Sequence, residues 1–361
     1  MVEKRNITLV GQFPPPNGGI SIPVKKIYDR LKNNEKTLDV NVIDISFNSK
    51  YEEKGDNIYT LTGNKLSLFL KTLRSISKHK NYIVHFHVAG FGMFFLVGHL
   101  LHLVCKDRFT ILTIHGGDFK RNYKNSSYTK KYLIYKLIEK FNKVITVNVE
   151  QKDFLQEKFQ IASDVIPVFD TPTYLKEKVD LKLKEYIMDF TNKFNKIIMF
   201  TGMMLDYYGL DILLRAFKYL VNQNNIGLII VLYGEHQDEE FKFKILKLIN
   251  EVNSNVKIFK KLEQQNFYYL LKNSDIFVRP THWDGDSSAL REAAYFQNQV
   301  IASDCTWRPN GVVTFENKSY KDLTKKLTKV INNNSLGILD SVEFDNTSKI
   351  INIYKDIIGI N

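Results

Sequence analysis

The chain has 361 residues, of which 44% are hydrophobic and 25% charged, so it can bury the cores of about two domains. Its net charge of +12 is uneven, because residues 1–170 carry 26 basic against 16 acidic side chains, whereas the rest carries 25 against 23. The two cysteines, Cys105 and Cys305, provide no disulfide framework and no Cys/His metal spacing, and they favour reduced thiols in a cytosolic protein.

The basic excess in the first half indicates an anionic partner, which can be nucleic acid, a phosphorylated acceptor or an anionic membrane face. A lysine-heavy composition without such a partner is the alternative. The first residues lead directly into an apolar run at 7–10, so we expect no secretory signal peptide. The apolar run 91–105 is too short to span a bilayer and predicts a buried helix.

Short β-branched runs alternate with amphipathic stretches, a pattern typical of a parallel α/β sheet. In chain order, the first half predicts strands at 6–10, 40–45, 82–86, 109–114, 143–147 and 163–166, and helices at 20–33, 65–78, 91–104, 127–141 and 149–159. The second half predicts strands at 196–201, 227–232, 256–259, 275–279 and 299–302, and helices at 209–223, 238–251, 263–272, 288–296, 318–332 and 345–358.

Two successive series of this kind predict two Rossmann-like domains facing a central cleft, with ligands beyond the carboxyl ends of the strands. We expect a first domain at 1–170, a linker at 171–192 and a second domain at 193–344. The linker is charged and shows little periodicity. The tail 345–361 is expected to pack back on the first domain.

The segment 275–295 carries the strongest functional signal. An apolar strand ends at Arg279, a polar loop follows, and a helix begins near Ser288. An open helix N-terminus attracts anions because its first N–H groups have no partner. The amides of Ser287 and Ser288 are therefore expected to hold a diphosphate, and Glu292, one turn into the helix, to reach a ribose. Asp284-Gly-Asp286 is also a possible metal motif, but no partner ligands are evident.

In each series, one glycine loop follows the first strand. Gly18 and Gly19 end a loop that three prolines stiffen, and glycine lets a backbone approach a ligand closely. The spacing differs from the dinucleotide fingerprint. Gly202 and Gly209 occupy the mirrored position in the second series.

Histidines end two of the predicted strands. His115, followed by Gly116 and Gly117, is placed to hydrogen-bond a sugar hydroxyl or to relay a proton. His85 and His87 end an earlier strand, and we expect one to point inward and one outward, so that at most one lines the cleft.

The segment 119–143 carries eight Lys or Arg and one acid, with aromatic residues between them. This profile indicates a helix on an anionic membrane surface. A solvated helix face over a core stripe is the alternative. Nucleic-acid binding is a weaker hypothesis, because no recognition module is present.

Taken together, these segments resemble the family 4 glycosyltransferases, which have the GT-B fold. The resemblance runs through nearly the whole chain, in order. It rests on the Pro-Pro-Pro-Asn-Gly-Gly loop, on Thr-Ile-His115-Gly, on the segment from Gly202 to Phe217, and on the region from Phe277 to Asp304.

The chain departs from the family pattern in two places. Asp284 replaces the first acid of the E-x7-E pair, whose second acid is Glu292. Met203 and Tyr208 stand where the family usually has an Arg/Lys and a Lys that neutralise the diphosphate. Helix dipoles and loop amides then hold the phosphate without these charge-assisted bonds. Arg279 and Arg308 are the candidate substitutes.

The resemblance implies transfer of a sugar from a nucleotide-diphosphate donor to an acceptor hydroxyl, with retention and no obligatory metal or cofactor. The acceptor would be a lipid-linked glycan for a surface polysaccharide such as a capsule or O-antigen, at the inner membrane face. Glu292 would bind the ribose and His115 the donor sugar at the reaction centre. Asp284, with amides around Gly285, Asp286, Ser287 and Ser288, would grip the sugar and diphosphate, which Gly18, Gly19 and Gly202 approach.

Two other functions fit the same fold. A non-catalytic binding or partner subunit is suggested by the absent Arg/Lys pair. A nucleotide-sugar epimerase would require paired acid and base residues and no acceptor. Fold alone does not decide among them.

Overall fold

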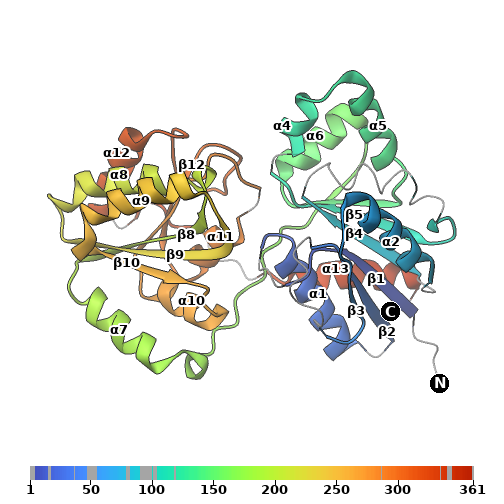
Figure 1. The fold of residues 1–361 in the computed structure, drawn as a ribbon, viewed down its shortest axis with the longest axis horizontal. Coiled ribbons are helices and arrows are strands. Elements are labelled where there is room, and N and C mark those ends of the chain that lie inside the picture. The colour runs from blue at the N-terminus through green and yellow to red at the C-terminus, as the bar shows by residue number, and fades with distance from the viewer. Residues whose placement is uncertain are drawn as a thin grey trace. The chain divides into compact units, whose positions relative to one another are not determined.

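The computed structural model describes residues 5–14, 18–35, 37–46, 55–78, 82–89, 100, 104–117, 119–285, 287–333, 335–339 and 344–359. The chain forms two compact units, both drawn in Figure 1. The first unit comprises 1–170 and 345–361, and the second comprises 171–344. The first unit is thus discontinuous in sequence, because the chain returns to it after the second unit is complete.

A seven-stranded sheet forms the centre of the first unit. Its strands are β1 (Arg5–Gly11), β2 (Leu38–Asp44), β3 (Ile58–Thr60), β4 (Ile83–Val88), β5 (Phe109–Ile114), β6 (Lys143–Thr146) and β7 (Asp164–Val165). They lie in the order β3-β2-β1-β4-β5-β6-β7, and neighbouring strands are parallel. The direction of winding reverses between β1 and β4, which makes this pair the topological switch point of the sheet.

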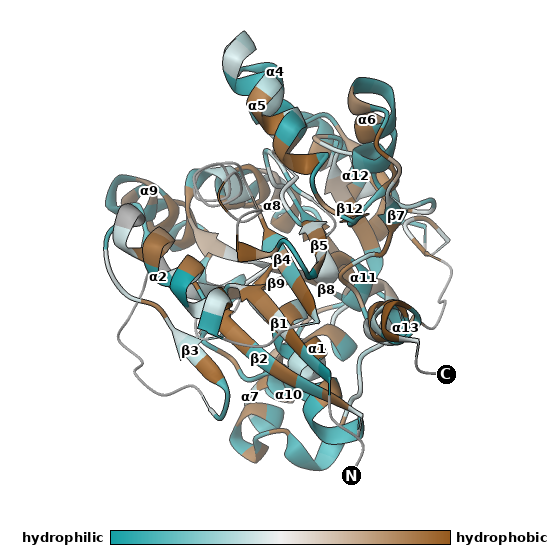
Figure 2. Ribbon diagram, turned by 90° about the vertical axis from the view of Figure 1, so that its right-hand side faces the viewer, coloured by the Kyte–Doolittle hydropathy of each residue, from teal (hydrophilic) through white to brown (hydrophobic). Residues whose placement is uncertain are grey.

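Helices cover both faces of this sheet: α1 (Ser21–Asn34), α2 (Lys65–Lys78), α4 (Phe119–Lys124), α5 (Tyr128–Ile138), α6 (Val149–Phe159) and α13 (Asn346–Ile358). Successive strand side chains point to opposite faces. Ile7 and Leu9 of β1 therefore pack with α1 and α13, whereas Val10 packs with α2, α5 and α6. In Figure 2 the strands β1 and β2 are mostly brown, and the helices carry both brown and teal residues.

A six-stranded sheet forms the centre of the second unit. Its strands are β8 (Lys196–Met204), β9 (Ile226–Gln237), β10 (Val256–Lys260), β11 (Ile276–Arg279), β12 (Gln299–Ser303) and β13 (Val313–Phe315). They lie in the order β10-β9-β8-β11-β12-β13, and again neighbouring strands are parallel. The switch point of this sheet lies between β8 and β11.

The helices of the second unit are α7 (Leu181–Thr191), α8 (Leu210–Val221), α9 (Glu239–Asn250), α10 (Gln264–Lys272), α11 (Ser288–Tyr295) and α12 (Tyr320–Ile331), with short 3-10 turns η1 (Lys176–Lys178), η2 (Asp206–Tyr208) and η3 (Asn253–Asn255). One core joins α8, α9 and α12 to the sheet, and a second core joins α7, α10 and α11 to the opposite face. Both faces are covered, which is why these strands are continuous apolar runs rather than alternating ones.

The two all-parallel sheets confirm the predicted fold class. Most predicted elements are present within a few residues of their expected ends. Helix α7 lies where we expected only a linker, and the short strands β3 and β13 were not predicted. The helix predicted at 91–104 lies largely outside the described residues. Within the described ranges, no helix combines the length and apolar character needed to span a membrane.

Candidate functional site

The switch point of the second unit gathers the polar residues predicted from 275–295. Arg279 is the last residue of β11, and its Nη1 donates to the carbonyl oxygen of Thr201 in β8 at 3.2 Å. Arg308 follows β12, and its Nε donates to the carbonyl oxygen of Ser303 at 3.0 Å. Two guanidinium groups are thereby anchored near the carboxyl ends of β8 and β12, the strands on either side of β11. This is the edge at which ligands bind in open α/β sheets.

Asp284 connects these two arginines. Arg279 donates to both of its carboxylate oxygens, from Nε at 2.9 Å and from Nη2 at 3.2 Å, and Arg308 donates from Nη1 at 3.2 Å. The hydroxyl of Thr281 and the amide of Gly285 donate to the same carboxylate at 3.3 and 3.1 Å. A carboxylate offers about four lone-pair sites, so protein donors fill its acceptor capacity.

This cluster is charged and almost fully enclosed. The side chains of Arg279, Asp284 and Arg308 expose 10%, 11% and 4% of their surface. Burial alone would raise the pKa of Asp284, but the charges and hydrogen bonds of the two arginines outweigh it and lower the pKa to about 2. Burial likewise works against the Arg279 cation, whose pKa the Asp284 charge nevertheless raises. With two cations and one anion, the cluster carries a net charge of +1.

The loop from Asp284 leads into α11. Ser287 is the N-cap of this helix, because its hydroxyl accepts from the amide of Leu290 at 3.4 Å. Ser288 is the first helical residue, whereas Asp286 lies outside the described residues. One turn on, Glu292 accepts a hydrogen bond from the hydroxyl of Tyr268 in α10 at 3.3 Å. Tyr268 was not predicted as a site residue, and no local sequence signal marks it.

The glycine loop of the second unit is tightly packed. Gly209 has φ +69°, and a Cβ there would lie 2.0 Å from the carbonyl oxygen of Pro280, so no other residue fits. A Cβ on Gly202 would lie 2.7 Å from the rings of Phe200 and Tyr208. These glycines let the end of β8 and the start of α8 approach the loop after β11.

Tyr208, which with Met203 replaces the absent basic pair, lies among other aromatic rings. The guanidinium of Arg279 lies 5.5 Å from the ring centre of Tyr208, within the range of a cation–π contact. The hydroxyl of Tyr233 donates to that of Tyr208 at 3.0 Å. Tyr207 stacks on the half-exposed ring of Trp283 at 4.8 Å. Tyr208 thus supports an arginine instead of supplying a cation of its own.

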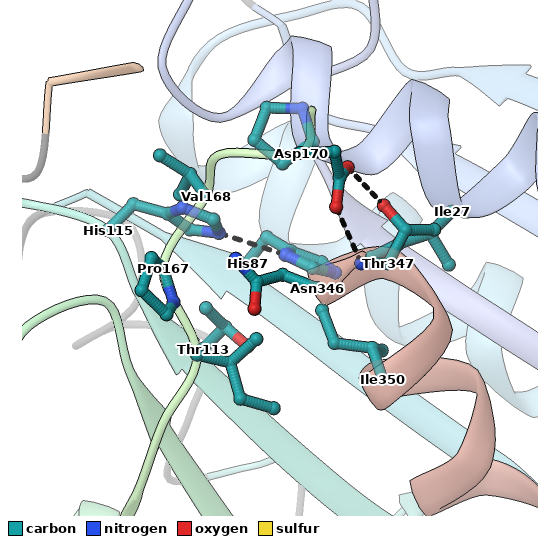
Figure 3. A pocket seen from close by; sticks show the side chains of 12 residues that line it. Ile27, His87, Thr113, His115, Pro167, Val168, Asp170, Asn346, Thr347 and Ile350 are labelled. Carbon is teal, nitrogen blue, oxygen red and sulfur yellow. Dashed lines mark hydrogen bonds between the residues drawn. The ribbon is translucent and has the colours of Figure 1, made fainter. Parts of the chain in front are cut away.

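The switch point of the first unit gathers three histidines. His87 Nδ1 and His115 Nε2 are 3.0 Å apart, which Figure 3 marks with a dashed line. His85 Nδ1 lies 2.5 Å from the hydroxyl of Tyr354 in α13, and its Nε2 lies 2.7 Å from that of Thr113. The rings of His85 and His87 are 4.1 Å apart. Tyr354 is 269 residues from His85 in sequence, and no sequence pattern predicts this contact.

The expected alternation of His85 and His87 was wrong. Residues two apart on a strand share a face, so His85 and His87 lie on the same face of β4 as Ile83. Both rings are buried on the α1 and α13 side, to which Ile83 and Ile111 also belong. Gly11 at the end of β1 makes room for them, because a Cβ there would lie 3.0 Å from the Cβ of His87.

These histidines are neutral at physiological pH. Burial, with a smaller contribution from His115, lowers the pKa of His85 to about 3, and burial lowers the pKa of His115 to about 3. Burial and the two neighbouring histidines lower the pKa of His87 well below its usual value. His87 and His115 line a cavity of about 20 Å³ with Thr113, Asp170 and Thr347, which is room for one water molecule. Figure 3 shows these side chains around it.

The glycine loop of the first unit is open where it is described. Within the described residues, no atom lies within 4 Å of a Cβ built on Gly19, and the nearest to one on Gly18 is the Ser21 hydroxyl at 3.8 Å. Upstream, the amide of Phe13 donates to buried Asp44 at 3.0 Å, which anchors the start of the loop.

Comparison of the sequence with known proteins identifies a matching family. Residues 188–339 match the family described as glycosyl transferases group 1. A Haemophilus influenzae protein described as an uncharacterized glycosyltransferase is 25% identical over 315 residues, which cover 82% of this chain and 83% of that protein. The capsular polysaccharide biosynthesis glycosyltransferase CapM of Staphylococcus aureus is 25% identical over 217 residues, which cover 57% of this chain and 51% of CapM.

A solved structure supports the fold along the full length. Anabaena HepE in complex with UDP and glucose aligns with a TM-score of 0.72 over 99% of this chain and 100% of that chain, at 15% sequence identity. The sheets of both units therefore have a counterpart in one GT-B protein. From the matched family, these relatives and this fold, we conclude that the chain belongs to the glycosyl transferase group 1 family, the family 4 glycosyltransferases with the GT-B fold, and is a glycosyltransferase.

Proposed function

We propose that this glycosyltransferase transfers a sugar from a nucleotide-diphosphate donor to an acceptor hydroxyl, with retention at the anomeric carbon. The acceptor we propose is a lipid-linked glycan in the assembly of a cell-surface polysaccharide. The observation that carries the donor part is the Arg279–Asp284–Arg308 cluster beside the N-terminus of α11. The UDP and glucose bound by HepE and the capsular role in the name of CapM support the donor class and the pathway.

The diphosphate would lie at the loop between β11 and α11. The amides of Ser287 and Ser288 are nearest to the helix N-terminus, whereas the amide of Gly285 donates to Asp284. Gly202 would complete this side of the site, and Asp286, which lies outside the described residues, stays a prediction. A helix N-terminus favours an anion through its unpaired N–H groups. The net +1 of the buried cluster adds a field of the same sign as the absent basic pair, so Arg279 and Arg308 would act on the diphosphate through their charge.

Asp284 has a different balance of roles from the one we predicted. Four residues donate five hydrogen bonds to its carboxylate, so a donor-sugar hydroxyl would have to displace one of these bonds. We therefore propose that Asp284 chiefly holds the two arginines and the loop amides in place. Glu292, which lies one turn into α11 and accepts a hydrogen bond from Tyr268, is the side chain proposed to bind the ribose.

In the first unit, His115 is proposed to contact the donor sugar at the reaction centre, and Gly18 and Gly19 to approach its diphosphate. His115 follows β5 and its backbone amide donates to the carbonyl oxygen of Val88 at 2.7 Å, which fixes the loop it begins. We assign no side chain as a nucleophile, so most of the rate would come from positioning and from stabilising the leaving diphosphate.

Membrane contact through 119–143 is proposed from exposed aromatic and basic residues on α5. Tyr128 and Tyr132 are 86% and 53% exposed, and four residues apart they share one face of the helix. Lys130 on α5 and Lys124 at the end of α4 are exposed as well. Tyrosine and lysine together suit the interface of an anionic bilayer, and this contact would place the enzyme at the inner membrane face. The apolar residues Ile134, Leu137 and Ile138 face the core.

Donor binding can be tested without an acceptor. Wild type, Glu292→Gln and Glu263→Gln would be melted with UDP-, GDP-, ADP-, CMP- and dTDP-sugars at millimolar concentration. A ligand that binds the folded protein raises the melting temperature by mass action. We expect one nucleotide series to stabilise wild type and Glu263→Gln, and to stabilise Glu292→Gln much less. Glu263 is an exposed matched control, because its side chain makes no helix-cap hydrogen bond.

The outcome separates the proposal from its rivals. Equal stabilisation of all three proteins would show that Glu292 does not bind the ribose. No stabilisation by any donor would count against a donor site and favour a non-catalytic role. The membrane part is tested by sedimentation with vesicles, where wild type is expected to bind those containing anionic lipid and Tyr128→Ser/Tyr132→Ser to bind less. Equal binding by both would remove α5 from the contact.

A further inference from the structure

Two side chains of α10 lead by hydrogen bonds to Glu292 of α11. The amide Nε2 of Gln264 donates to the hydroxyl oxygen of Tyr268 at 2.7 Å, and the hydroxyl of Tyr268 donates to Oε1 of Glu292 at 3.3 Å. Gln264 and Tyr268 are four residues apart, so they share one face of α10, and α10 packs against α11. Three polar groups from two helices therefore form one short chain, which ends at the carboxylate proposed to bind the ribose.

This chain of hydrogen bonds can run in only one direction. A tyrosine hydroxyl carries a single proton, and an ionised carboxylate has none to donate. The proton of Tyr268 must therefore point to Glu292, and the hydroxyl oxygen can then only accept from Gln264. An amide N–H of Gln264 meets that requirement, whereas its carbonyl oxygen would compete with Glu292 for the Tyr268 proton. Gln264 thereby directs the hydroxyl of Tyr268 towards Glu292.

Packing fixes the position of the Tyr268 hydroxyl. The residue is 2% exposed, and its ring contacts that of Phe296 with the ring centres 5.4 Å apart. It belongs to the core that joins α7, α10 and α11 to the sheet. Because protein interiors are close-packed, a ring enclosed in this way keeps one position, and so does its hydroxyl. Glu292, by contrast, is partly exposed, and its long side chain has rotamer freedom to lose.

From this geometry we infer that Tyr268 is a positioning residue, which holds the Glu292 carboxylate in place for the 2′ and 3′ hydroxyls of the donor ribose. The bond to Tyr268 takes one of about four lone-pair sites of the carboxylate. A side chain that is held before the ligand arrives loses less entropy on binding, so the ligand binds more tightly. This role deepens the proposed function and rests on it where it concerns the ribose, but the Tyr268–Glu292 contact is a property of the protein alone.

A carboxylate held in one place gives the site a preference for ribose over deoxyribose. A polar group aimed at a substrate hydroxyl rejects the analogue that lacks this hydroxyl, since the group is then left unpaired. A carboxylate that is free to turn away avoids that penalty. The preference for a 2′ hydroxyl therefore measures how firmly Glu292 is held, which the total affinity for a nucleotide does not.

The contact can be tested first without any ligand. Wild type, Tyr268→Phe, Glu292→Ala and the double variant would be compared by thermal melting. Residues in contact have non-additive effects, so we expect the double variant to lower the melting temperature by clearly less than the sum of the two single changes. An additive result would overturn the inference, whether or not the protein transfers a sugar.

Tyr269→Phe provides the matched control for this cycle. Tyr269 is the next residue of α10 and is also buried, with 8% exposure, but within the described part of the chain it makes no hydrogen bond with Glu292. Its effect on the melting temperature should add to that of Glu292→Ala, because the two side chains are not coupled. Coupling of the same size for Tyr269 and Tyr268 would show that the cycle reports general packing, and would overturn the inference.

Nucleotide selectivity tests what the contact does. The dissociation constants of UDP and 2′-deoxy-UDP would be measured by isothermal titration calorimetry, or those of the corresponding pair for the base that the donor screen selects. A hydrogen bond between a hydroxyl and a charged group gives wild type an expected preference of about tenfold or more for the ribonucleotide. Tyr268→Phe is expected to reduce this preference to about threefold or less, whereas Tyr269→Phe should keep it.

The outcomes distinguish a positioning role from a structural one. Weaker binding of both nucleotides by the same factor in Tyr268→Phe would show that Tyr268 only supports the fold, and would overturn the inference. Equal binding of the two nucleotides by wild type would overturn it as well. A coupled Tyr268–Glu292 pair in a protein that binds no nucleotide would contradict the proposed function, and with it the role of this pair towards the ribose.

Discussion

The two switch points bury polar groups in opposite ways. In the first unit, three histidines are buried as neutral rings, because burial lowers the pKa values of His85 and His115 to about 3. In the second unit, Arg279, Asp284 and Arg308 are buried as ions, because the charges of the arginines lower the pKa of Asp284 to about 2 against the effect of burial. The histidines of the first unit are therefore neutral, whereas Arg279, Asp284 and Arg308 stay ionised because they pair with one another.

This contrast fits the chemistry proposed for each site. A neutral histidine offers a directional hydrogen bond without attracting a counter-ion. A paired cluster with a residual +1 attracts an anion such as a diphosphate from a distance. The two sites also differ in what they tolerate, since a neutral network fails when one hydrogen bond is lost, whereas an ionic cluster fails when one charge is left alone.

Among substitutions that the backbone can accommodate, the largest effect is expected on the ionic cluster. Asp284→Asn keeps the shape of the side chain but leaves two buried guanidinium groups unpaired, which should lower the free energy of unfolding of the second unit by about 3–5 kcal/mol. The two tryptophans of the chain, Trp283 and Trp307, both lie in the second unit. Urea denaturation followed by tryptophan fluorescence therefore reports this unit selectively.

The surface pair Lys193–Asp189 provides the control for this change, because its side chains are 61% and 76% exposed. Asp189→Asn in the same unit should change the free energy of unfolding by less than about 1 kcal/mol. An effect of Asp284→Asn no larger than that of Asp189→Asn would mean that the cluster is solvated, and the contrast between the two sites would fail.

Acid should separate the two units. Unfolded histidines take up protons below pH 6.5 while His85 and His115 stay neutral down to about pH 3, so stability of the first unit is lost as pH falls from 6.5. By pH 5 the loss should reach roughly 2–4 kcal/mol. Asp284 has its pKa lowered from 3.8 to about 2, so its contribution is lost only below pH 4.

Urea denaturation at pH 7 and pH 5 can measure this order. Far-UV circular dichroism, which reports both units, should show at pH 5 a transition that precedes the loss of tryptophan fluorescence. Burial lowers the pKa of His282 in the second unit too, but Asp206 opposes this, so its contribution should be smaller. A fluorescence transition that moved first between pH 7 and 5 would reverse the comparison.

A smaller effect is expected when one hydrogen bond of the neutral network is removed. Tyr354→Phe leaves His85 Nδ1 buried without its hydroxyl partner, which should destabilise the first unit by about 1–3 kcal/mol. The early circular dichroism transition measures this. Tyr132→Phe in the same unit removes a hydroxyl from a half-exposed ring and should change stability by less than about 0.5 kcal/mol. Equal effects would argue that the Tyr354–His85 bond contributes nothing.

The smallest effect on stability is expected at Gly19. No described atom lies within 4 Å of its Cβ position, so Gly19→Ala should leave the free energy of unfolding within about 0.5 kcal/mol of wild type. If the loop approaches the donor, the methyl group weakens donor binding in the thermal-shift assay. Gly209→Ala is the opposite case, because its Cβ would meet a carbonyl oxygen at 2.0 Å, and it should prevent stable folding. A folded Gly209→Ala, or unchanged donor binding by Gly19→Ala, would contradict these expectations.

The sequence predicts the fold better than the sites, for physical reasons. Because both faces of each sheet are covered, buried parallel strands such as 109–114 are largely apolar and can be recognised in the sequence. Helix α7 was not predicted, because its sequence is charged and follows a stretch with prolines, although Asp180 caps it. The expectation that His85 and His87 point to opposite faces was wrong, because side chains two residues apart on a strand point to the same face.

The partners of the site residues could not be predicted at all. Asp284 pairs with Arg308 across 24 residues, and His85 pairs with Tyr354 across 269. Such contacts depend on how strands and loops are brought together, and no spacing in one sequence encodes them. Positions such as Arg279 and His115 were identifiable, because the end of a strand in a parallel sheet is a place that the sequence does mark.

The return of α13 to the first unit sets an order of events on the ribosome. Residues 1–170 emerge first, yet the helix that covers Ile7 and Ile83 and supplies Tyr354 comes only after about 174 further residues. At usual translation rates this is a delay of roughly 10–35 seconds. During that time the second unit, which is contiguous, can close its own core. The unit whose synthesis starts first is therefore the last to complete its core. Its apolar sheet face stays uncovered until α13 has been synthesised.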